Sequence, residues 1–320
     1  MDAEEWPVRD LYRSYLRGPS DFLRGVERFG ESLAAYLRAW ERHAVSFGAS
    51  SWLSPRWIGT LYGRWYGSRD DFVRSALEEY GRVFTSAFLE MGPYGMPPDA
   101  LLVERARQVG RDFRFAAVVQ DETLMYRFPY GHPDRMKRGE LNERFLEAEE
   151  LERRVLPSLR LLGPHLVVLR CAPLYATERV PTSDLLRRLD RFLAGLSRTY
   201  RWAVETGSPE LVLPEYRACL HDHNVAHLLR QRSGMPPILD QLAAPEIPAS
   251  DFCVLHVETG GEESELAVRE MIRRCREEEK TLYVYIEESS GKETPVFVAE
   301  LLSALNGELA RLSPFRRKAA

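Results

Sequence analysis

Carboxylate side chains stand at the ends of several short apolar runs, where a parallel sheet would gather them. We single out Glu90, Glu205 and Glu287 as candidate catalytic residues. Converging carboxylates can hold a divalent metal, or their pKa values can separate so that one acts as an acid and another as a base. Glu205 is the strongest candidate because it lies inside an apolar run, where an unpaired carboxylate is costly. A buried salt bridge to Arg170 or Arg201 would explain it equally well.

Polar and aromatic side chains near the same run ends form a candidate ligand-binding set. Its members are Ser50, Trp52, Trp57, Tyr94, Arg170 and His256. Trp52 and Trp57 can stack on bases or sugars, although a hydrophobic lid is the simpler interpretation. His256 on an apolar run is more often a core residue than a ligand. Ser50 has no nucleophile-elbow motif and no evident histidine partner, which disfavours a serine hydrolase.

A histidine-rich stretch holds His221, Asp222, His223 and His227. Two histidines in an HxH pattern can bind zinc from a strand, and a pair four residues apart can bind it from a helix. The stretch also fits a helix end, where histidine interacts favourably with the helix dipole. We favour the helix end, assign no metal ligand, and leave the cofactor unknown.

Short apolar runs alternate with amphipathic stretches after residue 43. The predicted strands are 44–50, 83–89, 113–119, 165–171, 200–206, 224–230, 252–258 and 281–287. The predicted helices are 68–80, 98–110, 140–161, 183–197, 213–221, 262–279 and 295–312. This alternation predicts an α/β fold, a TIM-type (β/α)8 barrel with a helical N-terminal extension. The rival, an open doubly wound sheet, usually carries a glycine-rich phosphate loop that this sequence lacks.

The pattern divides the chain into three parts. Residues 1–43 are the helical N-terminal extension, 44–312 the barrel, and 313–320 a basic C-terminal tail. Gly30 interrupts the apolar pattern of the extension and predicts a break into two helices. The amphipathic face favours a cap on the barrel over a helix that binds a partner. Two proline-rich segments, 126–139 and 233–250, are candidate lids.

Composition narrows the class of protein. The 320 residues carry 44 Lys+Arg against 48 Asp+Glu, a net charge of -4, which disfavours a strongly basic nucleic-acid-binding chain. The sequence has no long apolar run, so we expect no membrane partner. Its acidic, polar start is unlike a secretory signal, and its cysteines show no metal spacing. We therefore expect a cytoplasmic protein with reduced thiols.

Several strand ends match a known family in order. Gly48-Ala49-Ser50-Ser51-Trp52, followed by Trp57, Gly59 and Tyr62, resembles the opening of the domain of unknown function 72, or YecE-like, family. The segments Phe113-Arg114-Phe115-Ala116, Ala203-Val204-Glu205 and Leu282-Tyr283-Val284-Tyr285 also resemble that family. The resemblance covers residues 44–305 and implies a β/α barrel of unestablished function. A likeness suggested between the family and endonuclease IV makes nucleic acid a partner by analogy alone.

The departures from the family fall at the expected barrel mouth. Phe88, Val118 and Val168 stand where the family carries Glu, Lys and Gln, and Glu287-Glu288 replaces a pair of asparagines. We therefore expect a divergent member, a pseudoenzyme that binds an unknown small molecule or protein partner at a degenerate mouth. The alternative is a metal-assisted hydrolase acting on a phosphoester or nucleic acid through the strand-end carboxylates.

Overall fold

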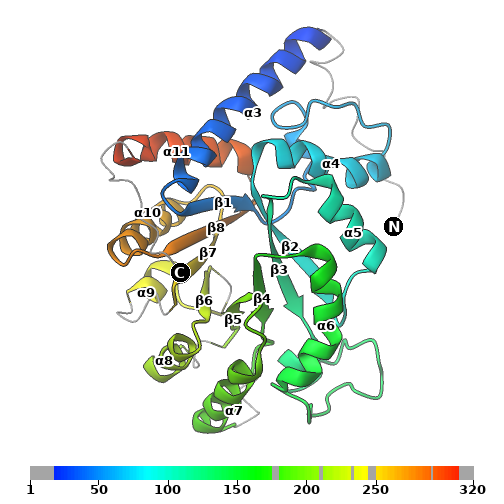
Figure 1. Cartoon of the computed structure of the whole chain (residues 1–320), viewed down its shortest axis with the longest axis vertical. Helices are drawn as coiled ribbons and strands as arrows, with labels where there is room; N and C mark the ends of the chain where they lie inside the picture. The colour runs from blue at the N-terminus through cyan, green and yellow to red at the C-terminus, as the bar shows by residue number, and fades with distance from the viewer. Residues whose placement is uncertain are drawn as a thin grey trace.

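Eight parallel strands close into a barrel that is ringed by helices (Figure 1). The computed structural model describes residues 18–174, 180–208, 212–231, 234–243, 250–289 and 291–309. The strands are β1 (Val45–Ala49), β2 (Ser86–Pro93), β3 (Arg114–Gln120), β4 (Leu166–Arg170), β5 (Arg201–Glu205), β6 (Ala226–Arg230), β7 (Phe252–Glu258) and β8 (Thr281–Glu287). The helices are α3 (Pro19–Glu41), α4 (Arg69–Val83), α5 (Asp99–Gln108), α6 (Ala148–Leu162), α7 (Thr182–Gly195), α8 (Pro214–Asp222), α9 (Ile238–Leu242), α10 (Glu262–Glu277) and α11 (Thr294–Leu309). The predicted (β/α)8 barrel is confirmed, and each predicted strand overlaps an observed one.

Two apolar layers build the barrel because successive side chains of a strand point to opposite faces. One layer lies inside the barrel and consists of Phe88, Ala116, Val118, Leu166, Val168, Ala203, Ala226, Leu228, Phe252, Val254, Tyr283 and Tyr285. The intervening residues, such as Val167 and Val204, belong to the larger core that also includes helix residues. Both faces of each strand are therefore buried, which is why the strands read as continuous apolar runs.

Helix α3 packs against the barrel through one face, with contacts to α4, α11 and β1 (Figure 1). Leu33, Leu37 and Trp40 are buried on this face, and Trp40 meets Phe47 of β1 edge-on at 6.4 Å. The helix runs unbroken through Gly30, so the predicted break there is wrong. A Cβ at position 30 would lie 3.2 Å from Val83 of α4, so the glycine permits close packing of the two helices.

Helix α6 begins at Ala148, whereas the sequence predicts a helix from residue 140. Residues 140–147 belong instead to a long connection after β3. The Asn142 side chain donates to the carbonyls of Glu122 at 2.8 Å and Met125 at 3.0 Å. Leu146 has φ 58, a conformation that cannot continue a helix. Side-chain hydrogen bonds to the residues that follow β3 thus replace the first two turns of the expected helix.

Several expectations fall outside the described residues. These are residues 1–17 of the extension, the tail at 313–320, and part of the second candidate lid, at 233 and 244–249. Among the described helices, none combines the length and apolar character that crossing a bilayer requires. All four cysteines are free thiols, with Cys253 and Cys275 buried and Cys171 and Cys219 partly buried.

Candidate functional site

The upper layer of the barrel is polar, although the layers beneath it are apolar. Each strand-end residue lies two positions beyond an inward-facing one, as Glu205 follows Ala203 and Arg230 follows Leu228. Strand alternation therefore turns eight residues toward the barrel axis. These residues are Ser50, Glu90, Gln120, Arg170, Glu205, Arg230, His256 and Glu287. Directly below them lie Phe88, Val118 and Val168, which are buried core residues.

Five of these residues form one chain of ion pairs. Arg170 Nε lies 2.6 Å from Glu205 Oε2, and Arg170 Nη1 lies 2.7 Å from Glu90 Oε2. Arg230 Nη1 lies 3.1 Å from Glu205 Oε1, and Arg230 Nη2 lies 2.8 Å from Glu287 Oε2. The chain thus runs Glu90, Arg170, Glu205, Arg230, Glu287. All three candidate catalytic carboxylates are in it.

Glu205 is the centre of this chain and is only 2% exposed. Its pairing with Arg170 follows from the register of β4 on β5, which places the two residues side by side. Burial disfavours the charge of Arg170, but the carboxylates of Glu205 and Glu90 outweigh it and raise the pKa of the guanidinium. Arg170 is one of the two salt-bridge partners expected for Glu205. The other, Arg201, instead donates to the Tyr283 hydroxyl at 2.6 Å, at the opposite end of β5.

Ser50 and His256 form a second polar contact in the same layer. Ser50 Oγ lies 2.6 Å from His256 Nε2, so the expectation that Ser50 has no histidine partner is wrong. Burial, and then the charges of Arg230 and Arg170, lower the pKa of His256 well below its usual value. The imidazole is therefore neutral. Its Nε2 also lies 3.9 Å from Glu287 Oε2, at the end of the ion-pair chain.

A cleft of about 600 Å³ opens above these side chains. Most of its lining residues have polar side chains, and the full lining consists of Ser50, Ser51, Leu53, Ser54, Pro55, Arg56, Trp57, Glu90, Arg230, His256, Glu287, Glu288 and Ser289. Its volume lies within the range that holds small-molecule ligands. One wall is built around Glu288, which accepts hydrogen bonds from the Trp57 indole and from Ser54 Oγ, the latter at 3.1 Å.

The cleft does not include every residue of the predicted ligand-binding set. Trp52 is 3% exposed and packs under α5, with Arg105 5.4 Å from its ring centroid. Tyr94 packs edge-on against His132, which lies on the connection after β3, with the two ring centroids 4.7 Å apart. Neither side chain lines the cleft. Arg170 lies just below it and holds Glu90 and Glu205 in place.

The first candidate lid, residues 126–139, is fixed beside the barrel. His132 Nε2 lies 3.1 Å from Glu122 Oε1, and Lys137 Nζ lies 2.7 Å from Glu122 Oε2. The pKa of Glu122 is lowered: burial alone would raise it, but the hydrogen bonds and charges of Lys137, Arg154 and His132 prevail. None of residues 126–139 lines the cleft, so this segment does not cover it in the structure.

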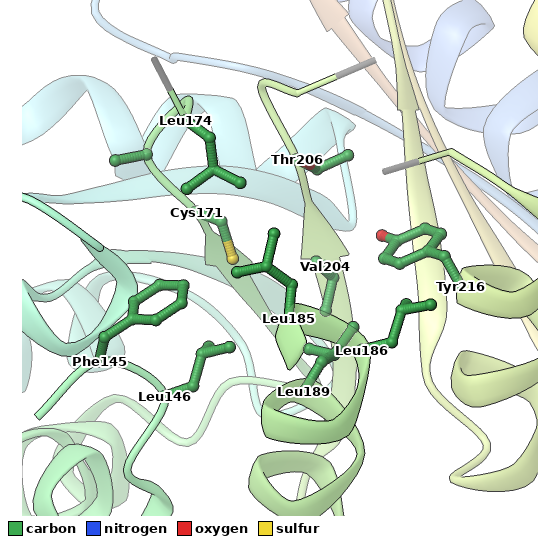
Figure 2. Close-up of a pocket in the computed structure, with 11 residues that line it drawn as sticks. Phe145, Leu146, Cys171, Leu174, Leu185, Leu186, Leu189, Val204, Thr206 and Tyr216 are labelled. Carbon is green, nitrogen blue, oxygen red and sulfur yellow. The ribbon is translucent and has the colours of Figure 1, made fainter. Parts of the chain in front are cut away.

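A second cavity lies outside the barrel, between the ends of β4 and β5 and helix α7 (Figure 2). It measures about 40 Å³ and is lined mainly by apolar side chains, among them Cys171, Leu185 and Val204. Burial, and then the charge of Glu205, raise the pKa of the Cys171 thiol to about 12. A space of this size holds about one water molecule, far less than a metabolite requires. We read it as a packing gap.

Two residues of the site are not among the candidate site residues chosen from the sequence. Arg230 bridges two carboxylates, and its place two residues beyond Leu228 could have revealed that it faces inward. Ser54 contributes a hydroxyl to the cleft from the connection after β1, where no periodic pattern indicates the direction of a side chain. The alternation of side chains along a strand therefore predicts which way a residue faces at a strand end better than it does in a loop.

Comparison with known proteins places the chain in a family. The profile described as "Protein of unknown function DUF72" matches residues 46–319. A DUF72 family protein from Enterococcus faecalis V583 superimposes with a TM-score of 0.54 at 12% identity, covering 86% of this chain and 99% of that one. A DUF72 family protein from Thermotoga maritima MSB8 gives a TM-score of 0.54 at 14% identity, covering 82% of this chain and 99% of that one.

At such low sequence identity, the structural similarity shows a shared fold and nothing further. No curated protein matches the chain. The family profile, however, spans most of the sequence, from the second residue of β1 through β8. This protein is therefore a member of the DUF72 family.

Proposed function

We propose that the cleft at the carboxyl end of the barrel binds a small polar molecule that is rich in hydrogen-bond donors. Hydroxyl and amine groups are the donors that fit best. The single observation that carries this proposal is the arrangement of the ion-pair chain, in which the arginines are mostly enclosed and the outer carboxylates remain open to the cleft.

The exposed fractions support this arrangement. The side chains of Glu90 and Glu287 are 47% and 43% exposed, whereas those of Arg170 and Arg230 are 12% and 19% exposed. Within the ion-pair chain, a ligand therefore meets carboxylate oxygens before guanidinium groups, whereas the Arg56 side chain elsewhere in the lining is 51% exposed. Carboxylates are acceptors only, so they favour ligands that donate.

The net charge of the lining residues also favours a ligand that donates hydrogen bonds. Glu90, Glu287 and Glu288 supply three carboxylates against the two guanidiniums of Arg56 and Arg230, leaving one net negative charge. Arg56 Nη1 is itself 3.4 Å from Glu288 Oε1. A phosphate or nucleic-acid backbone would have to compete with the carboxylates that already pair with Arg56 and Arg230, the two guanidiniums of the lining.

The same pairing disfavours the metal-assisted hydrolase. Carboxylates that bind Mg²⁺ or Ca²⁺ must turn oxygens toward a common point. In the part of the chain that the structure describes, such grouping of three ligand atoms occurs on the outer helices and not at the barrel mouth. Glu205 has both oxygens on guanidinium groups. We therefore assign it a positioning role beneath the cleft.

A thermal-shift comparison of variants tests the proposal. Polyols, amino sugars and polyamines are screened against wild type, Glu287→Gln and Glu258→Gln. Glu258 ends β7 beside Glu287, is exposed and does not line the cleft, so its substitution is a matched control. We expect a donor-rich probe to raise the melting temperature of wild type and Glu258→Gln but not of Glu287→Gln. Hydrolysis of a phosphodiester that requires Mg²⁺ or Mn²⁺ and is lost in Glu90→Gln would instead support the hydrolase.

A further inference from the structure

Two outer helices bring three different metal-binding side chains together, away from the barrel mouth. Asp190 lies on α7, Cys219 lies on α8, and His223 is the residue at which α8 ends. One potential ligand atom from each lies within 4.8 Å of the others. His223 Nε2 is already 2.8 Å from Asp190 Oδ1, and Cys219 is a free thiol.

The local geometry explains why these three meet. Cys219 and His223 are four residues apart, so they share one face of the last turn of α8. Helix α7 packs against α8 and supplies Asp190 from the other side. The His223 side chain is only 12% exposed, whereas the Asp190 side chain is 64% exposed and free to rotate. The cluster thus combines two anchored groups with one adaptable one.

The neighbouring histidines are directed elsewhere. The His221 side chain is 72% exposed and lies beside Asp222. His227 is buried on β6, with its Nδ1 3.1 Å from the Tyr216 hydroxyl. The histidine pairs weighed in the sequence analysis therefore do not converge. His223 instead meets a cysteine and an aspartate that the sequence pattern did not connect with it.

Acidic groups surround the cluster: Asp190 is one of its members, and the carboxylate of Asp222 lies near Cys219. One cationic group is close by, because Arg198 Nη1 donates to the backbone carbonyl of His223 at 3.0 Å. That bond holds the backbone of His223 and leaves its ring free to face Asp190.

We propose that Asp190, Cys219 and His223 form a site for one zinc-like divalent cation that fastens α7 to α8. A sulfur, a nitrogen and a carboxylate oxygen are all zinc ligands, and water completes a tetrahedral shell. Zinc bonds of about 2.0–2.3 Å require ligand atoms roughly 3.3–3.8 Å apart. The His223 Nε2–Asp190 Oδ1 distance of 2.8 Å must lengthen slightly to reach this range, which rotation of the exposed Asp190 side chain allows. The site lies where α8 leads into β6, at the end of the barrel that usually serves stability.

Cobalt titration of the full chain tests the proposal. The protein is treated with chelator, kept reduced, and titrated with Co²⁺, which replaces zinc and reports its ligands by absorption. We expect saturation at about one equivalent, with the near-ultraviolet band of a thiolate bound to cobalt and the visible bands of a tetrahedral ion. Zinc should displace the cobalt and raise the melting temperature, since it binds the folded state.

Matched variants identify the ligands. Cys219→Ser should abolish the thiolate band, while His223→Gln and Asp190→Asn should each weaken cobalt binding about tenfold or more. His221→Gln and Glu287→Gln are controls that should bind like wild type, the second because it alters only the barrel mouth. Melting curves of the metal-free variants establish that each is folded. Absence of a thiolate band in wild type, or its persistence in Cys219→Ser, would overturn the proposal.

Discussion

Ser50 Oγ and His256 Nε2 lie 2.6 Å apart and join β1 to β7 across the barrel mouth. The two residues are 206 positions apart in the chain, and β8 lies between their strands. The contact therefore depends on closure of the barrel. It also fixes the Ser50 hydroxyl beside Glu287, one of the two carboxylates that remain open to the cleft.

The neutral state of His256 predicts a pH dependence of stability. Burial is the main cause that lowers the pKa values of three histidines, His256, His165 and His227. The pKa is about 3 for His165 and about 4 for His227. In the unfolded chain each would bind a proton below about pH 6.5, but in the fold each resists it. The contribution of these histidines to the free energy of unfolding is therefore fully present above about pH 6.5. As the pH drops below that value, the free energy of unfolding decreases by about 1.4 kcal/mol per pH unit for each histidine.

Urea unfolding between about pH 7 and pH 5 measures this slope, in a range above the carboxylate titrations. His256→Gln should reduce the slope by roughly one third, because one of the three histidines is removed. The comparison uses only the slope of the unfolding free energy against pH. A loss of stability that is the same at every pH therefore does not affect the comparison. An unchanged slope would mean that His256 is as easily protonated in the fold as in the unfolded chain.

Removing the charge of Glu205 should destabilise the fold. Glu205→Gln would leave the buried guanidiniums of Arg170 and Arg230 without their shared counter-charge, although the amide oxygen can still accept one hydrogen bond. We expect a loss of about 2–4 kcal/mol in the free energy of unfolding. Denaturant titration measures it, with Glu258→Gln as the exposed control, expected within about 0.5 kcal/mol of wild type. Equal stability of the two variants would show that the ion-pair chain contributes little.

Gly48 should be intolerant of any side chain. A Cβ at this position would lie 2.5 Å from the carbonyl oxygen of Ser86 on β2 and 3.2 Å from the Tyr285 ring. Gly48→Ala must therefore push β1 from β2, and we expect a loss of about 3 kcal/mol, measured by denaturant unfolding. Gly25 on α3 has nothing within 4 Å, so Gly25→Ala should instead stabilise the helix by about 0.5–1 kcal/mol. A Gly48→Ala protein as stable as wild type would refute this close approach.

The fold was largely predictable because the physical signal is strong. A strand buried on both faces leaves a continuous apolar run, as in β4 and β7, and the runs recur between amphipathic helices. The failures were local. Gly30 reads as a helix break unless the close packing on Val83 is known. The start of α6 was misplaced because Asn142 hydrogen bonds to carbonyls distant in sequence.

The site was predictable only in part. Alternation and apolar runs indicated that Glu205 is buried, and the register of β4 on β5 supplied its partner Arg170. The contact of Ser50 with His256 required the order in which the strands close, which a sequence does not display. Trp52 and Tyr94 were grouped with the cleft because they follow strand ends, but beyond a strand the alternation no longer fixes the direction of a side chain.

The central claim concerns the chemistry that the barrel mouth selects, and two matched sugars test it most directly. Native mass spectrometry would compare glucosamine with glucose 6-phosphate at equal concentrations, since they share a hexose ring and differ in the sign of charge. The protein would carry Cys219→Ser and His223→Gln, so that any divalent metal retained must lie outside the α7–α8 cluster. Glu287→Gln and Glu258→Gln would be added to this background in turn.

The account predicts that glucosamine forms the more abundant adduct, that Glu287→Gln reduces it, and that Glu258→Gln leaves it unchanged. Preferential binding of glucose 6-phosphate would contradict the account. So would a divalent metal that is retained by this protein and lost on substitution of Glu90 or Glu287.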